Sequence, residues 1–214
     1  MNRRYLTESE QLRLLSGPKG RADELAQRDY HWMSALVLTG MRITEFSRLT
    51  VGLAKQALYA GWLVSPKGHC KGGRAPNEYA VTLRLREHLT ALVRLSEAQG
   101  CLPDGDAPLV WGREGAAMSV RGYQRRMDVW VKLAGLDPRV SPHWLRHSRA
   151  MNIMRRSRGN NPLKVCQVAM NHRSLASTGV YLQLSREELA QELQIVEGGR
   201  LAKGVARSLV EVRP

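Results

Sequence analysis

The sequence is poor in cysteine and has no long apolar run. Cys70, Cys101 and Cys166 lie far apart, and no Cys-x-x-Cys pair occurs. Neither a disulfide framework nor a zinc knuckle is therefore expected, and all three side chains are predicted to be free thiols. No window approaches the roughly twenty apolar residues of a membrane span, and no charged start leads into a signal-type apolar region. These absences favour a soluble, intracellular protein.

Acidic residues are also scarce, which leaves a large excess of positive charge. The 214 residues include 33 Lys and Arg against 19 Asp and Glu, which gives a formal net charge of +14. With 43% hydrophobic residues, the chain can build one good core and perhaps one large domain. A surface this basic attracts a polyanion, and nucleic acid is a likelier partner than a membrane.

The segment 141–184 contains residues that can meet at one phosphate. Pro142 after Ser141 predicts the start of a helix, on which His143 and Arg146 share a face because they are three positions apart. A second helix is predicted to start at Asn161-Pro162 and to close at Asn171. Its buried side is expected to consist of Leu163, Val165, Val168 and Met170.

Two further residues of this segment complete the candidate site. His172 follows the end of the second helix, and Tyr181 lies nine residues further on. Attack on a phosphodiester requires stabilisation of the non-bridging oxygens, which an arginine fork provides, and proton transfer at the entering and leaving oxygens. A tyrosine nucleophile adds a covalent intermediate that stores the bond energy. The strand could then be rejoined without ATP, metal or ligase.

This segment resembles the catalytic end of the tyrosine recombinases, the phage integrase family. The family pattern is His-x-x-Arg-His, then Gly-His, then Thr-x-x-Tyr, and this chain has HWLRH at 143–147, NH at 171–172 and TGVY at 178–181. Two departures stand out. Trp144 replaces the usual acidic residue, and Asn171 replaces the usual glycine. Asn is the non-glycine residue that best tolerates a left-handed backbone, so the second change is expected to be mild.

A second motif of the same family precedes this segment. The stretch TGMRITEFSRL at 39–49 matches Thr-Gly-x-Arg-x-x-Glu-x-x-x-Leu. Gly40 permits a sharp turn from which Arg42 projects, and Glu45 lies three residues further on, where it can fix the guanidinium. The resemblance implies that Arg42 is the second arginine of the phosphate clamp. A lone arginine would instead be interpreted as a surface residue near a helix start.

A basic hairpin is predicted between these two motifs. The pattern from Val51 to Leu83 is interpreted as extended, with strands at 61–64 and 77–83 joined by a turn rich in Pro, Gly, Lys and Arg. The resemblance implies a lysine in this turn that protonates the departing sugar oxygen. Lys67 and Lys71 are both candidates. Lys71 is favoured because its KGGR phrase looks more like the family's turn, and a phosphate-contacting lysine is the alternative.

The remaining helices and basic residues complete the expectation. Helices are predicted to start near residue 8, after a Thr7/Glu10 capping box, and to span 28–39, 84–99 and the region following Ser119, with a last one after Ser185. His31, His69 and His88 are expected to be structural, and His147 to brace Arg146. The residues predicted to contact DNA are Lys67, Arg74, Arg121, Arg125 and Arg149.

The resemblance implies a mainly α-helical catalytic domain with a small antiparallel hairpin or three-stranded sheet. Residues 1–198 would form this domain, and 199–214 a tail that docks on a neighbouring protomer. The opening Leu-Thr-x-x-Glu phrase lies almost at residue 1, so no N-terminal core-binding domain is expected. The chain is then either similar to the single-domain fimbrial phase-switching recombinases or a fragment.

The implied activity is site-specific DNA recombination through a 3′-phosphotyrosyl link to Tyr181. Arg42, Arg146 and His172 would stabilise the phosphorane, while His143 and Lys71 would transfer protons. Neither metal nor cofactor is expected. The implied partners are double-stranded DNA, further copies in a tetrameric synapse formed from free monomers, and accessory DNA-bending proteins, in the cytoplasm with the nucleoid. A catalytically silent DNA-binding regulator and a type IB topoisomerase are the alternatives.

Overall fold

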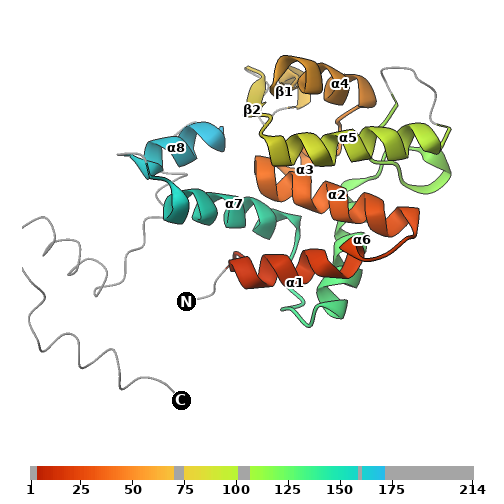
Figure 1. Ribbon diagram of the computed structural model, residues 1–214, viewed down its shortest axis with the longest axis horizontal. Helices are drawn as coiled ribbons and strands as arrows, with labels where there is room; N and C mark the ends of the chain where they lie inside the picture. The colour runs from red at the N-terminus through yellow and green to blue at the C-terminus, as the bar shows by residue number, and fades with distance from the viewer. Residues whose placement is uncertain (1–3, 70–74, 101–106, 159–160, 172–214) are drawn as a thin grey trace, which may run out of the picture.

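The computed structural model describes residues 4–69, 75–100, 107–158 and 161–171, and these form a mainly helical fold (Figure 1). None of the helices in these ranges is long and apolar enough to cross a membrane. The elements, in chain order, are α1 (Glu8–Lys19), α2 (Glu24–Thr39), α3 (Ile43–Phe46), α4 (Val51–Ala60), β1 (Trp62–Ser65), β2 (Asn77–Ala80), α5 (Leu83–Ala98), α6 (Val120–Leu133), α7 (Pro142–Arg156) and α8 (Pro162–Ala169).

Helix α2 lies at the centre and packs against α1, α5 and α7 (Figure 1). It begins at Glu24, one turn before the predicted start, because the Asp23 side chain caps it by accepting a hydrogen bond from Ala26 N at 2.8 Å. It ends at Gly40, which has a φ of 66°. A left-handed residue that ends a helix is the usual place for glycine, and the predicted turn before Arg42 is confirmed.

The first turn of α1 and the residues before it are tied to α7 by polar contacts. The capping box of Thr7 and Glu10 is confirmed. The side chains of Gln11 and Asn152 hydrogen-bond one another at 3.0 Å. The backbone N–H of Leu6 donates to the Ser148 hydroxyl at 2.9 Å. These bonds anchor the start of the chain on the helix that carries His143 and Arg146.

The predicted hairpin is present, but the helix before it was missed. Strands β1 and β2 pair antiparallel, with Leu63 opposite Tyr79. The interpretation of 51–60 as extended is wrong, because this stretch is α4. The Thr50 side chain caps α4 by accepting from Leu53 N at 3.2 Å, and the buried residues Ala54 and Ala57 recur at helical spacing. Strand β2 ends at Ala80, and no third strand joins the sheet in the described part of the chain.

The main core explains why tryptophan is accepted at position 144. The ring of Tyr123 on α6 packs edge-on against Trp32 at 4.9 Å and Phe46 at 6.1 Å between centroids. Trp144 belongs to the same core and is 8% exposed. A charged side chain at this position on α7 would be costly to bury without a partner. The departure from the family pattern therefore serves packing.

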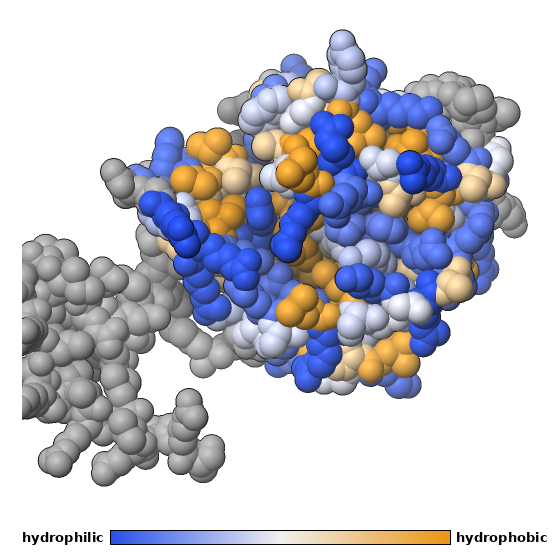
Figure 2. Space-filling model, in the orientation of Figure 1, coloured by the Kyte–Doolittle hydropathy of each residue, from blue (hydrophilic) through white to orange (hydrophobic). Residues whose placement is uncertain are grey.

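Helix α8 buries only part of the predicted face. Met170 is buried as predicted, but Val165 and Val168 are 45% and 63% exposed, and Cys166 is buried instead. The prediction of a buried side at Val165 and Val168 is wrong, because α8 packs on α7 through a small separate cluster that includes Ile153. Cys166 and Met170 lie four residues apart and share the face toward that cluster. Figure 2 shows hydrophobic residues over α8, as one of several hydrophobic patches interspersed with hydrophilic residues on this face.

Candidate active site

Glu45 is the buried anchor of the first predicted arginine. Its carboxylate is fully buried and accepts from Arg42 Nη1 at 2.9 Å. The second carboxylate oxygen accepts from the Tyr79 hydroxyl at 2.8 Å and from Asn77 Nδ2 at 3.2 Å, both on β2. Burial, and then the Glu45 charge, raise the pKa of Tyr79, so its hydroxyl stays protonated and donates. Arg42 remains 32% exposed. The anchor thus holds a guanidinium at the surface.

Arg146 joins the ends of two helices beside Arg42. Its side chain is 4% exposed. Nη1 donates to the carbonyl of Gly40, at the end of α2, and Nη2 donates to the carbonyl of Met170, at the end of α8, at 2.8 Å. Gly40 lies two residues before Arg42. The two arginines predicted from separate motifs, 104 positions apart in the numbering of the sequence, are therefore brought to one place.

Asn171 adopts the left-handed conformation that the sequence predicted. Its φ is 50°, and it is the one non-glycine residue with a positive φ in the described ranges. Its side-chain Nδ2 donates to the carbonyl of Glu78 on β2 at 2.9 Å. The replacement of the family's glycine therefore keeps the backbone turn and adds a bond to the hairpin.

His143 lies next to both arginines on the exposed side of α7. Its pKa is lowered by burial first, and then by the charges of Arg146, Arg42 and Arg4. The imidazole is thus held neutral to lower pH than usual and can accept a proton. The ring of His147 packs edge-on against that of His143, with 4.5 Å between centroids. This contact gives His147 a place beside the site, and its predicted role of bracing Arg146 stays a prediction.

Four of the predicted site residues fall outside the described ranges. They are Lys71, Arg74, His172 and Tyr181. Within the described ranges the structure brings together Arg42, Glu45, His143, Arg146 and His147. The catalytic roles of these residues and of the other four remain predictions.

The remaining predicted DNA contacts differ in exposure. Lys67, in a 3₁₀ turn after β1, is exposed, as are Arg121 and Arg125 on α6. Arg149 is half-buried, and burial lowers its pKa. A Cβ at Gly40 would lie 3.0 Å from Arg149 Cγ. The aliphatic part of the Arg149 side chain therefore packs against Gly40, at the turn that precedes Arg42.

A second buried carboxylate was not predicted as a centre of bonding. Asp29 on α2 is fully buried and accepts hydrogen bonds from two arginines and two tryptophans. The donors and their distances are Arg28 Nη2 at 2.9 Å, Trp32 Nε1 at 3.1 Å, Arg126 Nε at 2.6 Å and Trp130 Nε1 at 2.9 Å. Arg28 and Trp32 lie close to Asp29 in the sequence, but no local spacing signals the two donors from α6, since Trp130 lies 101 residues from Asp29. We assign it to the core, where it joins α2 to α6.

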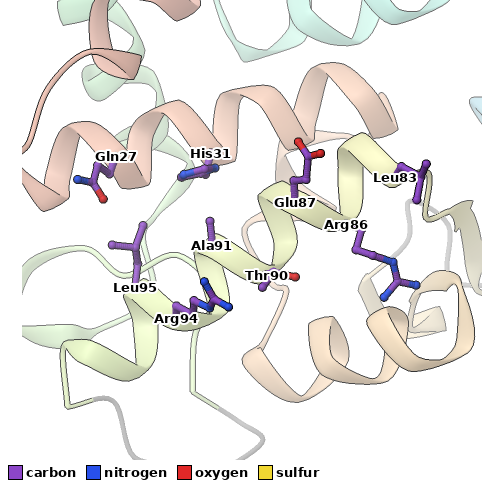
Figure 3. A pocket seen from close by; sticks show the side chains of 9 residues that line it. All are labelled: Gln27, His31, Leu83, Arg86, Glu87, Thr90, Ala91, Arg94 and Leu95. Atoms are coloured by element: carbon purple, nitrogen blue, oxygen red, sulfur yellow. The ribbon is translucent and has the colours of Figure 1, made fainter.

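The hollow between α2 and α5 lies apart from Arg42 and Arg146, neither of which lines it. It has a volume of about 750 Å³, and Figure 3 shows Gln27 and His31 from α2 opposite Ala91 and Leu95 from α5. Within the described ranges, no group of three or more His, Cys, Asp or Glu residues is placed to hold a metal ion. The Arg42–Arg146–His143 arrangement, which we call the arginine site, is the candidate for phosphate chemistry.

Comparisons with known proteins identify relatives of this chain. A tyrosine recombinase XerC of Neisseria gonorrhoeae is 30% identical over 182 residues, which are 84% of this chain and 54% of that protein. The XerC of Proteus mirabilis is 27% identical over 172 residues, 79% of this chain and 52% of that protein. The chain thus spans about half the length of these relatives.

Solved structures show the same fold. The crystal structure of XerA recombinase superposes with a TM-score of 0.67 at 22% identity, covering 92% of this chain and 64% of that one. The Tn1549 transposon integrase, in complex with transposon right end DNA, superposes with a TM-score of 0.72 at 18% identity, covering 91% and 66%. The phage integrase family model matches residues 4–188, which include every residue of the arginine site. The chain therefore belongs to the phage integrase family.

Proposed function

We propose that this chain cuts and rejoins DNA strands as the catalytic domain of a site-specific recombinase. The observation that carries the proposal is the convergence of Arg42 and Arg146, from different elements, with His143 beside them. Two fixed guanidinium groups can stabilise the charge that develops on the non-bridging oxygens of a phosphodiester. Membership in the phage integrase family supports the same reaction.

The proposed chemistry is a pair of transesterifications. The hydroxyl oxygen of Tyr181 attacks the scissile phosphorus and passes its proton to His143. The bond from phosphorus to the 5′ oxygen breaks, and that oxygen takes a proton from Lys71. The 3′-phosphotyrosyl link is then attacked by the 5′-hydroxyl of a partner strand, which gives its proton to Lys71. The bond from phosphorus to Tyr181 breaks, the tyrosine oxygen takes back the proton from His143, and the bond energy is conserved. His172 joins Arg42 and Arg146 in stabilising both transition states. The steps balance without metal, cofactor or nucleotide.

DNA binding and assembly belong to the same proposal. The net charge of +14 supports binding to phosphates, with Lys67, Arg121 and Arg125 as exposed contacts. A full exchange of two duplexes requires four active tyrosines, hence a tetramer on DNA in which the tail 199–214 links protomers. The XerH recombinase was captured with its difH substrate, which is a precedent for a relative bound to its DNA site.

Covalent trapping tests this function. The protein and its Tyr181→Phe variant are mixed with a nicked random-sequence duplex library and denatured in SDS, and the attached DNA is sequenced. The proposal predicts adducts that share a sequence with the wild-type chain and none with the variant. Adducts without a shared sequence, together with relaxation of any supercoiled plasmid, would indicate a topoisomerase. Firm DNA binding without any adduct would indicate a regulator and contradict the proposal.

A further inference from the structure

Asn171 does more than close α8. Its φ of 50° is a conformation that glycine adopts at no steric cost, so the turn alone does not call for a side chain. The backbone N–H of Asn171 donates to Val168 O at 3.0 Å, which completes the end of the helix. Its carboxamide reaches out of the helix instead, to the carbonyl of Glu78, 93 residues away in the sequence. The side chain therefore has a partner that the turn does not need.

The position of this bond connects the supports of the two arginines. Met170, immediately before Asn171, accepts from Arg146 Nη2 at 2.8 Å. The residues on either side of Glu78 are Asn77 and Tyr79, and both donate to the carboxylate that holds Arg42. The Asn171 bond thus runs from the support of one guanidinium to the support of the other.

We propose that Asn171 is a positioning residue that fixes the end of α8 against β2 and thereby sets Arg146 relative to Arg42. This proposal rests on the proposed function for its effect on catalysis, but the link between α8 and β2 can be measured without DNA. Two guanidinium groups that clamp one phosphate must hold their spacing to a fraction of an ångström, because small misplacements cost rate. The Asn171 bond adds a direct link between the two supports, beside the link that Arg146 itself makes between Gly40 and Met170.

Two substitutions separate the side chain from the turn. Asn171→Gly keeps the left-handed backbone and removes the carboxamide. Asn171→Asp keeps the size and the tolerance of positive φ, but its carboxylate faces the Glu78 carbonyl without a proton to donate. The matched control is Asn161→Gly at the other end of α8, where the Asn161 side chain caps the helix by accepting from Lys164 N at 2.9 Å. Glycine is well tolerated at such a cap.

Hydrogen exchange of the full chain provides the readout without DNA. We expect the amides of β2 and of the last turn of α8 to exchange about three- to tenfold faster in Asn171→Gly than in the wild type, the factor that a typical hydrogen bond contributes. In Asn161→Gly, β2 should exchange at the wild-type rate. Unchanged exchange at β2 in both Asn171 variants would overturn the proposal, whatever the chain does to DNA.

The rate of adduct formation provides the catalytic readout. We expect a three- to tenfold slower rate in Asn171→Gly and a larger loss in Asn171→Asp, with the Kd for DNA unchanged in both. If Asn171 served only the turn, both variants would react at the wild-type rate, and that result would overturn the catalytic part of the proposal. Absence of any wild-type adduct would instead sink the proposed function, while the exchange measurement would still decide whether Asn171 fixes α8 to β2.

Discussion

Asp29 and Glu45 are two fully buried carboxylates that the chain uses in opposite ways. Each forms an ion pair with an arginine that is about one-third exposed, Arg126 at 31% and Arg42 at 32%. Asp29 joins two long helices in the main core. Glu45 lies on the one-turn helix α3 and joins it to the hairpin, and the arginine it holds lies beside Arg146. The Asp29–Arg126 pair therefore stabilises the core, whereas the similar Glu45–Arg42 pair holds a positive charge at the candidate site.

The surroundings of each carboxylate account for the difference. Asp29 is also bonded by Arg28, which is 3% exposed, and by two indole N–H groups, so its donors are committed to the core. The other donors to Glu45 come from Tyr79 and Asn77, neutral groups that hold the carboxylate without competing for its charge. A buried acid paired with an arginine is thus not by itself a sign of a catalytic site. The sign is a second cation and a histidine next to the exposed part of the arginine.

The largest expected effect comes from removing the Asp29 charge. Asp29→Asn should lower the free energy of unfolding by about 3–5 kcal/mol, because it leaves the buried Arg28 with an uncompensated charge. Urea unfolding followed by circular dichroism measures this. A loss below about 1 kcal/mol would mean that Asp29 is not a core anchor, and the contrast with Glu45 would disappear.

Compared with Asp29→Asn, the Glu45→Gln substitution should lower the free energy of unfolding less and the rate of adduct formation more. We expect a loss of about 1–3 kcal/mol in the free energy of unfolding, since the amide keeps the size of the side chain and Arg42 can turn to solvent. Adduct formation by the folded fraction should nevertheless fall further than in Asp29→Asn. Unfolding and covalent trapping on the same samples check both halves. An equal loss of activity per folded molecule in the two variants would break the comparison.

A buried polar contact that involves no carboxylate gives a reference for how much such contacts contribute to the free energy of unfolding. His31 and His88 join α2 to α5 through their Nδ1 atoms at 2.9 Å. Burial is the main cause that lowers the pKa of each histidine to about 4. The charge of His88 lowers the pKa of His31 further, and the charges of Arg84 and Lys19 lower that of His88. The native state thus prefers neutral rings, while the unfolded chain takes up protons near pH 6.5.

The sign of the pH dependence follows from these pKa values. The stabilisation is fully present above pH 6.5 and is lost as the pH falls from 6.5 toward 4, because only the unfolded state binds protons in that window. We expect a loss of about 1–2 kcal/mol, less than the full shift would give, since both rings are partly exposed. Urea unfolding between pH 7 and 4 measures it. His88→Gln should flatten this slope, and an unchanged slope would contradict the assignment.

Tyr79→Phe should have the smallest effect on stability. The ring volume is kept and only the hydroxyl that donates to Glu45 is lost, so we expect about 0.5–1.5 kcal/mol. Asn77 and Arg42 still bond the carboxylate. The measurement is the shift of the urea midpoint against the wild type. A loss as large as that of Asp29→Asn would show that the Glu45 anchor is part of the core after all.

The sequence predicted those parts of the site that follow from fixed local spacing. Arg42 with Glu45, and His143 with Arg146, were found because each pair lies three residues apart within a motif. The left-handed Asn171 followed from the backbone tolerance of its residue type. The fold class was predicted from the family motifs, and the hairpin from the pattern of its two strands.

Contacts between distant segments could not be predicted. Strand alternation can indicate that Tyr79 is buried, but not that its hydroxyl meets a carboxylate 34 residues away. The four donors around Asp29 form two Arg/Trp pairs, each four residues apart on its own helix, but the sequence does not show that the pair on α6 meets a carboxylate about a hundred residues away. Helix α4 was missed because its short apolar run fits a strand as well as a helix, although the cap at Thr50 and the helical spacing of Ala54 and Ala57 favour the helix.

Arg42→Lys and Arg126→Lys form a matched pair for the decisive test, since both arginines have nearly equal exposure and a buried carboxylate partner. Lysine keeps the charge and loses the bidentate fork. The measurement is the rate of covalent adduct formation on one nicked duplex, at equal folded protein. We expect Arg42→Lys to lose about a hundredfold or more, and Arg126→Lys to stay within about fivefold of the wild type. Equal losses in the two variants, or a wild-type rate in Arg42→Lys, would contradict the assignment of the arginine site.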